Sequence, residues 1–249
     1  MARAAIRRRL IWQLGTVEQV LAETDRTASI VLRVPDWPGH RAGQHVDVRL
    51  TAEDGYRAQR SYSIASAPDE EAVVLTVERL EDGEVSSYLV GELRAGDELE
   101  LRGPIGGYFV WEEAMGGPLM LIAGGSGIVP LRAMLRHRLA RKSVVPVRLL
   151  YSARSHPELI YREELRKVEE EAGVDIRLTL TREQPAGWQG YDRRIDRGLI
   201  AEVAWPPAER PLAYICGPTS FVEAAADALV STGYEPSRVR TERFGPTGR

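Results

Sequence analysis

The residues best suited to bind an anion lie in a glycine-rich segment, Gly124–Gly127, between an apolar run and a stretch of helical period. Glycines let the backbone turn tightly and bring its amide groups close to a ligand. A helix that opens near Ile128 adds unpaired N–H groups and a partial positive charge. Pro130 fits the first turn of this helix, because its missing N–H would be unpaired there anyway. The segment predicts a diphosphate site, with a ligand-free tight turn as the alternative.

Two further clusters have residue types that suit a cofactor. In Arg60-Ser61-Tyr62-Ser63, the planar fork of Arg60 matches a pair of phosphate oxygens, and the ring of Tyr62 is suited to stacking. Cys216-Gly217-Pro218 follows the apolar run Leu212–Ile215, at the kind of strand end where parallel sheets place ligands. The glycine segment is not the usual GxGxxG fingerprint, since Pro130 stands where the third glycine would be.

Composition limits the classes of function. The chain of 249 residues is 43% hydrophobic and 28% charged, with a net charge of −3, which is ordinary for a globular protein and gives no reason to expect nucleic acid as a partner. No apolar run reaches the roughly 18–20 residues that cross a bilayer. The arginines of residues 1–9 are not followed by an apolar stretch, so we expect a solvated arm, or a docking patch, rather than a signal peptide.

The chain has a single cysteine, Cys216. One thiol cannot form an internal disulfide, and four cysteines are typically needed to hold an iron–sulfur cluster. We therefore expect a cytoplasmic protein whose residues hold no such cluster. The four histidines, His40, His45, His137 and His156, are scattered, and we predict no metal site.

Two halves of the chain have different hydrophobic periods. Residues 10–111 contain short alternating stretches, such as Ile30, Leu32 and Val34, separated by turn signals, which predicts an antiparallel β-barrel. From residue 118 onward apolar runs alternate with stretches of helical period, which predicts a parallel sheet with helices on both faces. The predicted fold class is therefore β followed by α/β, with domains at residues 10–111 and 118–249 and a boundary at Glu112–Gly117.

The same patterns predict individual elements. In the barrel we expect one short helix, Ser86–Leu93, between two strands. In the second half we expect, in chain order, strand Leu119–Ala123, helix Ile128–Leu139, strand Val144–Tyr151, helix Glu158–Glu171, strand Val174–Leu180, strand Leu212–Cys216, helix Ser220–Thr232 and strand Val239–Phe244.

Four segments, taken in order, resemble the ferredoxin–NADP reductase-like flavoproteins over residues 10–244. Arg60–Ser63 is similar to the family's Arg-x-Tyr-Ser flavin motif, and Gly83–Leu89 to its Gly-x-x-Ser-x-aromatic-Leu flavin-phosphate segment. Gly124–Pro130 and Cys216–Pro218 resemble its two pyridine-nucleotide motifs. The resemblance implies a flavin-binding barrel followed by a nicotinamide-binding domain, with FAD favoured over FMN.

On the flavin side, the resemblance implies that Arg60 binds a phosphate, that Tyr62 stacks and bonds the ribityl chain, and that Ser63 bonds the N5 edge where hydride arrives. The implied set also includes Ser61, Val77, Gly83, Val85, Ser86 and Phe244. Each main residue has a structural alternative: a surface ion pair for Arg60, a barrel-core position for Tyr62, a bond within its own strand for Ser63, and a plain N-cap for Ser86.

On the nucleotide side, the resemblance implies contacts from Gly124, Gly125, Ser126, Gly127, Pro130, Ser152, Arg154, Cys216, Gly217 and Pro218. Cys216 would border the nicotinamide without proton chemistry, or would be a structural thiol. Glu242 is a candidate active-site carboxylate, so the predicted catalytic residues are Ser63, Cys216 and Glu242. Phe244 either covers the flavin face or packs in the core; many family members end at this aromatic, whereas here five residues follow it.

The choice of coenzyme depends on Tyr151–Ser155, which offers hydroxyl groups and the guanidinium of Arg154. A guanidinium suits a 2′-phosphate and no acidic residue is present, which favours NADPH over NADH, unless Arg154 points to solvent.

The resemblance implies a flavin-dependent oxidoreductase that takes hydride from NAD(P)H onto bound FAD and passes electrons to a separate acceptor, such as a ferredoxin, another iron–sulfur or heme protein, or an oxygenase component. An acidic carrier would dock on the basic arm or on Arg132–Arg141, unless that stretch is simply a solvated helix face. One alternative is a flavin reductase that releases reduced flavin. Another is a non-catalytic flavin- or nucleotide-binding module, since fold does not fix function.

Overall fold

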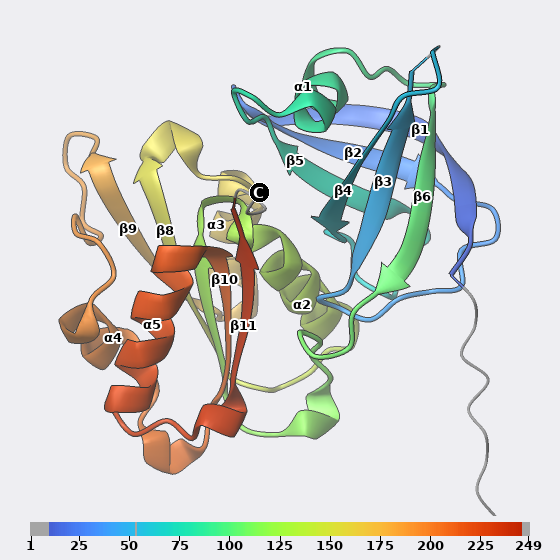
Figure 1. The fold of residues 1–249 in the computed structure, drawn as a ribbon. Helices are drawn as coiled ribbons and strands as arrows, with labels where there is room; N and C mark the ends of the chain where they lie inside the picture. Colours follow the sequence, from blue (N-terminus) through green and yellow to red (C-terminus); the bar gives the residue numbers. More distant parts are fainter. Residues whose placement is uncertain (1–9, 53, 246–249) are drawn as a thin grey trace, which may run out of the picture.

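The computed structural model describes residues 10–52 and 54–245, and its strands form two separate sheets (Figure 1). The first sheet is antiparallel, with the strand order β4-β3-β6-β1-β2-β5. Its strands are β1 Trp12–Thr24, β2 Thr27–Arg33, β3 His45–Thr51, β4 Arg57–Ser63, β5 Val73–Glu78 and β6 Glu98–Ile105. The predicted basic arm of residues 1–9 lies outside the described residues, as does the end of the tail after residue 245.

The antiparallel sheet closes on itself. Its two edge strands meet where Ile64, just after β4, pairs with Leu75 of β5, and Ala65 N–H donates to the carbonyl of Val74 at 2.7 Å. Alternate residues such as Ile30 and Val46 fill the interior, as the period-two pattern requires. The helix α1, Glu84–Gly91, lies against β4 and β5. The predicted antiparallel barrel is confirmed.

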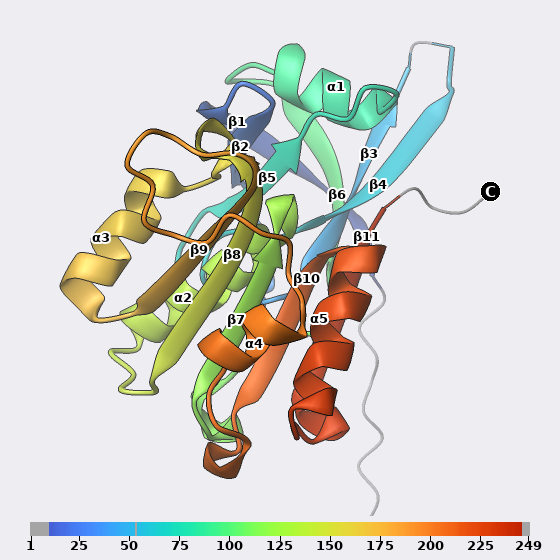
Figure 2. The ribbon, with the colours of Figure 1, turned by 90° about the vertical axis from the view of Figure 1, so that its left-hand side faces the viewer.

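The second sheet is parallel, with the order β11-β10-β7-β8-β9. Its strands are β7 Leu119–Gly124, β8 Val147–Ser155, β9 Asp175–Glu183, β10 Leu212–Pro218 and β11 Val239–Phe244. Helices α2 (Ile128–Ala140) and α3 (Arg162–Ala172) pack on one face, while α4 (Arg197–Val203) and α5 (Thr219–Ser231) pack on the other (Figures 1 and 2). Because both faces are covered, every residue of β7 is buried, which explains its uninterrupted apolar run. The predicted α/β arrangement is confirmed.

Some predicted bounds are wrong for identifiable reasons. The helix α3 begins at Arg162 rather than Glu158, because a short 3-10 turn comes first and Tyr161 has a left-handed backbone. The strand β8 begins at Val147 rather than Val144, since Pro146 has no N–H for the ladder. The helix α1 begins at Glu84 rather than Ser86.

The helix α4 was not predicted. It has only seven residues, too few for a clear helical period, and it begins where the side chain of Asp196 accepts a hydrogen bond from Leu199 N–H at 2.7 Å. Within the part of the chain that the structure describes, no helix has the length and apolar character needed to span a membrane.

Candidate active site

The turn that follows β7 packs closely against the end of β10, with no side chain between them. A 3-10 turn, Gly125–Gly127, follows β7, and α2 begins at Ile128 as predicted. A Cβ atom on Gly127 would lie 2.0 Å from the carbonyl oxygen of Cys216. A Cβ atom on Gly217 would lie 2.8 Å from the ring of Phe221. Only glycine permits such close approach, so the two strand ends meet as backbone against backbone.

The outer side of the same turn is open. Gly125 has a φ of +56°, and a Cβ atom there would meet nothing within 4 Å. Gly125 and Ser126 are partly exposed, whereas Gly127 and Pro130 are buried in the packing of α2. The exposed part of the turn thus lies directly before the N-terminus of α2, where a helix favours an anion. Pro218 similarly precedes α5 and is exposed.

Cys216 and Glu242 lie next to each other at the carboxyl edge of the sheet, because β10 and β11 pair in register at these positions. Cys216 is 2% exposed, and burial raises the pKa of its thiol, with the charge of Glu242 acting in the same direction. The thiol therefore stays protonated near neutral pH.

Glu242 is the unusual member of this pair. One of its carboxylate oxygens is buried and has no hydrogen-bond partner within residues 10–52 and 54–245. Burial raises the pKa of this carboxyl to about 7. A buried carboxylate with an unused oxygen that titrates near neutral pH is typical of a functional group.

On the barrel side, β4 presents two faces. Arg60 is exposed, and in the described part of the chain it makes no ion pair; its guanidinium donates only to the neighbouring carbonyl of Gln59 at 2.6 Å. Tyr62 shares the face of Arg60, is half-buried, and has its pKa raised to about 12 by burial, so its hydroxyl remains a donor. Ser61 points to the opposite face, where its hydroxyl donates to Asp47 at 2.6 Å.

Ser63 ends β4 and is half-buried. Its hydroxyl forms no hydrogen bond with another described residue, so the alternative of a bond within its own strand is not what the structure has. The side chains of Arg60, Tyr62 and Ser63 are therefore all available to a ligand, whereas that of Ser61 is already engaged.

The predicted phosphate segment, Gly83–Leu89, forms the N-cap and the first turns of α1. Ser86 is buried; its hydroxyl accepts from Leu80 N–H and donates to the carbonyl of Gly83, both at 3.1 Å. A Cβ atom on Gly83 would lie 2.3 Å from this hydroxyl, so glycine is required there. Ser86 thus holds the turn and is not a plain N-cap. Val77 and Val85 are buried in the barrel core, which leaves only their backbone groups for a ligand.

One contact between the two halves, and one pairing within the barrel, bring the parts of the site together. The glycine turn Gly125–Gly127 lies against β5, and β5 pairs with Ile64 directly after Ser63. In Figure 1 the carboxyl ends of β10 and β11 point toward this edge of the barrel. Phe244, the last residue of β11, is 37% exposed and belongs to none of the core clusters of the described residues. The core alternative for Phe244 is therefore wrong, and its ring stays available as a cover.

The predicted coenzyme residues lie on β8. Ser152 is buried between Gly124 of β7 and Thr179 of β9, and Arg154 is exposed. Alongside the edge strand β9 lies an open hollow of about 740 Å³, which is lined by His156, by residues 176–178 of β9 and by the loop 185–191. Its walls include the rings of Trp188 and Tyr191.

Sequence reasoning missed this hollow, as it missed the ring of Phe221 against the glycines. The cluster of glycine and aromatic residues at 187–191 was the available signal for the hollow.

The predicted docking stretch Arg132–Arg141 is not a free surface at its start. Arg132 was expected to dock a carrier or to lie on a solvated helix face. In the structure Arg132 is only 9% exposed, and its guanidinium pairs with Glu164. Arg136 pairs with Glu70 and Glu164. The sequence between residues 132 and 141 did not reveal this, because both carboxylates come from distant segments.

A barrel with a free arginine and a stacking ring, facing a glycine-lined parallel sheet, defines a two-domain oxidoreductase of the flavin and pyridine-nucleotide class. Comparison with known families agrees with this class. Residues 16–110 match the oxidoreductase FAD-binding domain, and residues 121–227 match the oxidoreductase NAD-binding domain. The chain belongs to the ferredoxin–NADP reductase-like flavoproteins, and its cofactors are FAD and NAD(P)H.

Individual relatives support the family. The chain is 32% identical over 212 residues to the glycine betaine monooxygenase reductase subunit of Chromohalobacter salexigens, covering 83% of this chain and 56% of the relative. It is similar in structure to the FAD/NAD-binding domain of nitric oxide dioxygenase from Vibrio cholerae, with a TM-score of 0.84 and 26% identity over 94% of this chain and 99% of that one. An Amycolatopsis cytochrome P450 reductase has a TM-score of 0.83 and 28% identity, covering 96% and 71%.

The chain spans little more than half the length of curated relatives that it matches, 56% of the reductase subunit described above. The residues present nevertheless fit both cofactors. Arg60 lies on β4, a strand that contacts α1, and pairs with no carboxylate of the described residues. The backbone at Gly125 is open, and one buried oxygen of Glu242 has no partner among residues 10–52 and 54–245.

Proposed function

We propose that this protein takes hydride from NADPH or NADH onto FAD and passes electrons to a separate iron–sulfur or heme protein. The observation that carries the proposal is the contact of the glycine turn with β5. The turn adjoins the strand end with the Cys216–Glu242 pair, and β5 pairs with Ile64, directly after Ser63. Near-attack geometry for hydride transfer needs reacting atoms about 3–3.5 Å apart, so the two binding sides must meet.

Bound FAD would accept hydride and release electrons one at a time, which no amino acid does. The chain's own residues bind and orient. Arg60 would hold a phosphate through its fork, and the ring of Tyr62 would stack. The hydroxyl of Ser63 would bond the edge of the flavin ring. The open backbone at Gly125, where a Cβ atom would meet nothing within 4 Å, would let the diphosphate of the nucleotide approach the turn.

Glu242 would tune the charge of this site. Because its pKa is raised to about 7, the carboxyl is neutral below that pH and charged above it. A negative charge there favours a cationic ring over a neutral one, so it would favour the nicotinamide after it has given up hydride.

The preference for NADPH belongs to the same proposal. Arg154 is exposed on β8, two residues before His156, which lines the hollow together with Trp188 and Tyr191. An aromatic wall suits an adenine, and a guanidinium suits a 2′-phosphate. Because the NADPH pool and a reduced cysteine both belong to the cytoplasm, we place the protein there.

A separate electron acceptor is proposed for two reasons. The relatives described above include a reductase subunit of a monooxygenase and a cytochrome P450 reductase. The chain has one cysteine, so these residues cannot supply the four ligands of a cluster. The acceptor's docking surface is not on the first turns of α2, where Arg132 and Arg136 are engaged within the protein.

The test is anaerobic stopped-flow reduction of the purified yellow protein by NADPH and by NADH, with mass identification of the flavin. We expect the flavin absorbance to bleach within the turnover time, the flavin to be FAD, and electrons to pass onward to added ferredoxin or cytochrome c. Reduced flavin in the filtrate of an ultrafiltration cell would instead favour a flavin reductase. A protein that binds flavin but is bleached by neither nucleotide would be a non-catalytic module, and the proposal would fail.

A further inference from the structure

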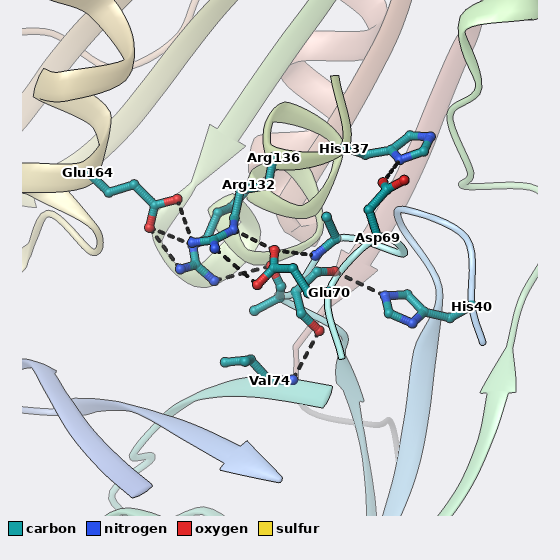
Figure 3. A network of polar contacts seen from close by, with 11 residues as sticks. His40, Asp69, Glu70, Val74, Arg132, Arg136, His137 and Glu164 are labelled. Atoms are coloured by element: carbon teal, nitrogen blue, oxygen red, sulfur yellow. Dashed lines mark hydrogen bonds and ion pairs between the residues drawn. The ribbon is translucent and has the colours of Figure 1, made fainter. Parts of the chain in front are cut away.

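A buried arginine links the two halves of the candidate site. Arg132 lies in the second turn of α2, the helix that begins directly after the glycine turn. Its guanidinium bonds Glu164 of α3 at 2.9 and 2.8 Å, and it also donates to the backbone carbonyl of Ala65 at 3.2 Å. Ala65 belongs to the barrel and follows Ser63 by two residues. One side chain thus joins α2 and α3 to the barrel segment that follows β4. Figure 3 shows Arg132 beside Glu164.

A buried tyrosine makes a second link at the same place. The guanidinium carbon of Arg132 lies 4.4 Å from the ring centre of Tyr161, and the Tyr161 hydroxyl donates to Thr76 of β5. Thr76 in turn shares a hydrogen bond with Ser29 at 2.8 Å within the barrel. Tyr161 therefore reaches from the start of α3 to the strand that the glycine turn touches.

Both residues occupy costly positions. Tyr161 has a φ of +60°, a left-handed backbone conformation that is unfavourable for a residue other than glycine. The guanidinium of Arg132 is largely removed from water, which is unfavourable unless its hydrogen bonds are satisfied. An ion pair at the surface would hold the barrel and the parallel-sheet half together without either unfavourable feature. These two side chains lie near Ser63 and β5. Their place indicates that they set the relative position of the site's elements, rather than only holding the two halves together.

Neighbouring contacts provide a contrast. One turn further along α2, Arg136 pairs with Glu70 at 2.7 Å and His137 with Asp69 at 2.5 Å. These two contacts join α2 to the barrel residues Asp69 and Glu70 (Figure 3), and Arg136 also pairs with Glu164 at 3.2 Å. The side chain of Arg136 is 34% exposed, against 11% for Arg132. These contacts can hold the barrel against the parallel-sheet half, but they do not contact the strands that carry the predicted flavin residues.

We propose that Arg132 and Tyr161 are positioning residues, which fix the end of β4 and strand β5 relative to the glycine turn so that the two cofactor rings meet in one reactive arrangement. This inference rests on the proposed hydride transfer. It assigns neither residue a contact with either cofactor. Loosening the link should therefore change how the rings meet, while flavin affinity and nucleotide affinity stay nearly constant.

The test compares Arg132→Met and Tyr161→Phe with Arg138→Met as the control. Arg138 lies on the same helix, but its guanidinium bonds the carbonyl of Val145 at 2.9 Å, within the parallel-sheet half. Each holoprotein is mixed anaerobically with NADPH and with NADH. The limiting rate of flavin reduction, the nucleotide Kd, the bound flavin content and the long-wavelength charge-transfer absorbance of the stacked rings are recorded.

We expect Arg132→Met to lower the limiting rate by roughly tenfold or more, since misplacement by about 1 Å can cost as much as a hundredfold. The charge-transfer absorbance should weaken with it, while the nucleotide Kd and the flavin content change by less than about threefold. Tyr161→Phe removes one hydroxyl and keeps the ring, so it should show the same pattern in smaller measure, about threefold in rate. Arg138→Met should match the wild type.

Wild-type rates and full charge-transfer absorbance in both variants would overturn the inference while the proposed function stands. An equal loss in Arg138→Met would also overturn it, because general weakening of the helix would then explain the effect. If the wild-type protein is bleached by neither nucleotide, the proposed function fails and the positioning role fails with it.

Discussion

The two sides of the candidate site are built in opposite ways. The barrel side presents side chains: the free fork of Arg60, the ring of Tyr62 and the hydroxyl of Ser63. The parallel-sheet side works through missing side chains, because Gly127 and Gly217 let strand ends and turn approach as bare backbone. Removing an exposed side chain should weaken ligand binding and leave the stability of the fold nearly unchanged. Adding a methyl group to a close-packed glycine should instead lower the stability of the fold.

The difference explains why one motif type is easier to interpret than the other. Arg60 indicates a phosphate through the chemistry of its own guanidinium, which is the same wherever the residue lies. A glycine indicates only that something comes close, and the neighbour is decided by the tertiary fold. Here that neighbour is the carbonyl of Cys216, far away in sequence.

The largest expected effect is that of Gly127→Ala. Its Cβ atom would lie 2.0 Å from the carbonyl oxygen of Cys216, so the turn must move. We expect a loss of about 3 kcal/mol in the free energy of unfolding, at the upper end for overpacking. Urea unfolding of the flavin-free protein measures it. Gly91→Ala is the matched control, since nothing lies within 4 Å of its Cβ position. Equal stability of the two variants would break the comparison.

Next in size is Arg60→Ala, which tests the barrel side. Loss of a charge-assisted phosphate contact should weaken FAD binding by about 2 kcal/mol, or roughly thirtyfold. The flavin-free protein should unfold as the wild type does, because the side chain is exposed. Arg57→Ala is the control, an exposed arginine on the other face of β4. Full flavin content in Arg60→Ala, measured by absorbance after desalting, would remove Arg60 from the site.

Glu242→Gln tests a candidate side chain on the parallel-sheet side, next to Cys216. A carboxyl whose folded pKa is raised to about 7 binds its proton more tightly in the folded state, so its contribution to stability falls as pH rises from about 4.5 to about 7. Glutamine removes that dependence. The variant should therefore gain stability over the wild type between pH 5.5 and pH 8.5, by about 1–2 kcal/mol after allowance for solvent screening. Parallel stability curves for the two proteins would show that Glu242 has an ordinary pKa.

The smallest expected effect is that of Arg154→Ala on the choice of coenzyme. Loss of an exposed ion pair with a 2′-phosphate should cost about 1 kcal/mol, or roughly a fivefold rise in KM for NADPH. The KM for NADH should change little, because NADH lacks that phosphate. Arg182→Ala, another exposed arginine on the neighbouring strand β9, is the control. Equal changes for both coenzymes would end the argument for NADPH.

Much of the fold was predictable because its signals are local. Alternation over two residues marked the barrel strands, and uninterrupted apolar runs marked strands covered on both faces. The bounds that failed depend on single backbone events, such as the left-handed Tyr161 that delays α3. The short helix α4 escaped because seven residues are too few for a period to show.

The candidate site was predictable only in part. Arg60, Tyr62 and Ser63 were found by residue type, and the structure leaves all three available to a ligand. For Ser61 and Ser86 residue type was insufficient: both hydroxyls are used within the protein, by Asp47 and by the turn before α1.

By itself, the amino-acid sequence determined the two periodicities, the glycine turn and the residue types that bind phosphate, because each depends on neighbours along the chain. Tertiary structure alone decided which polar groups remain free. Arg132 has the same side chain as Arg60, yet its partners lie 32 and 67 residues away and bury it. Burial and pairing follow from contacts across the fold, and such contacts set both the pKa of Glu242 and the meeting of the two halves.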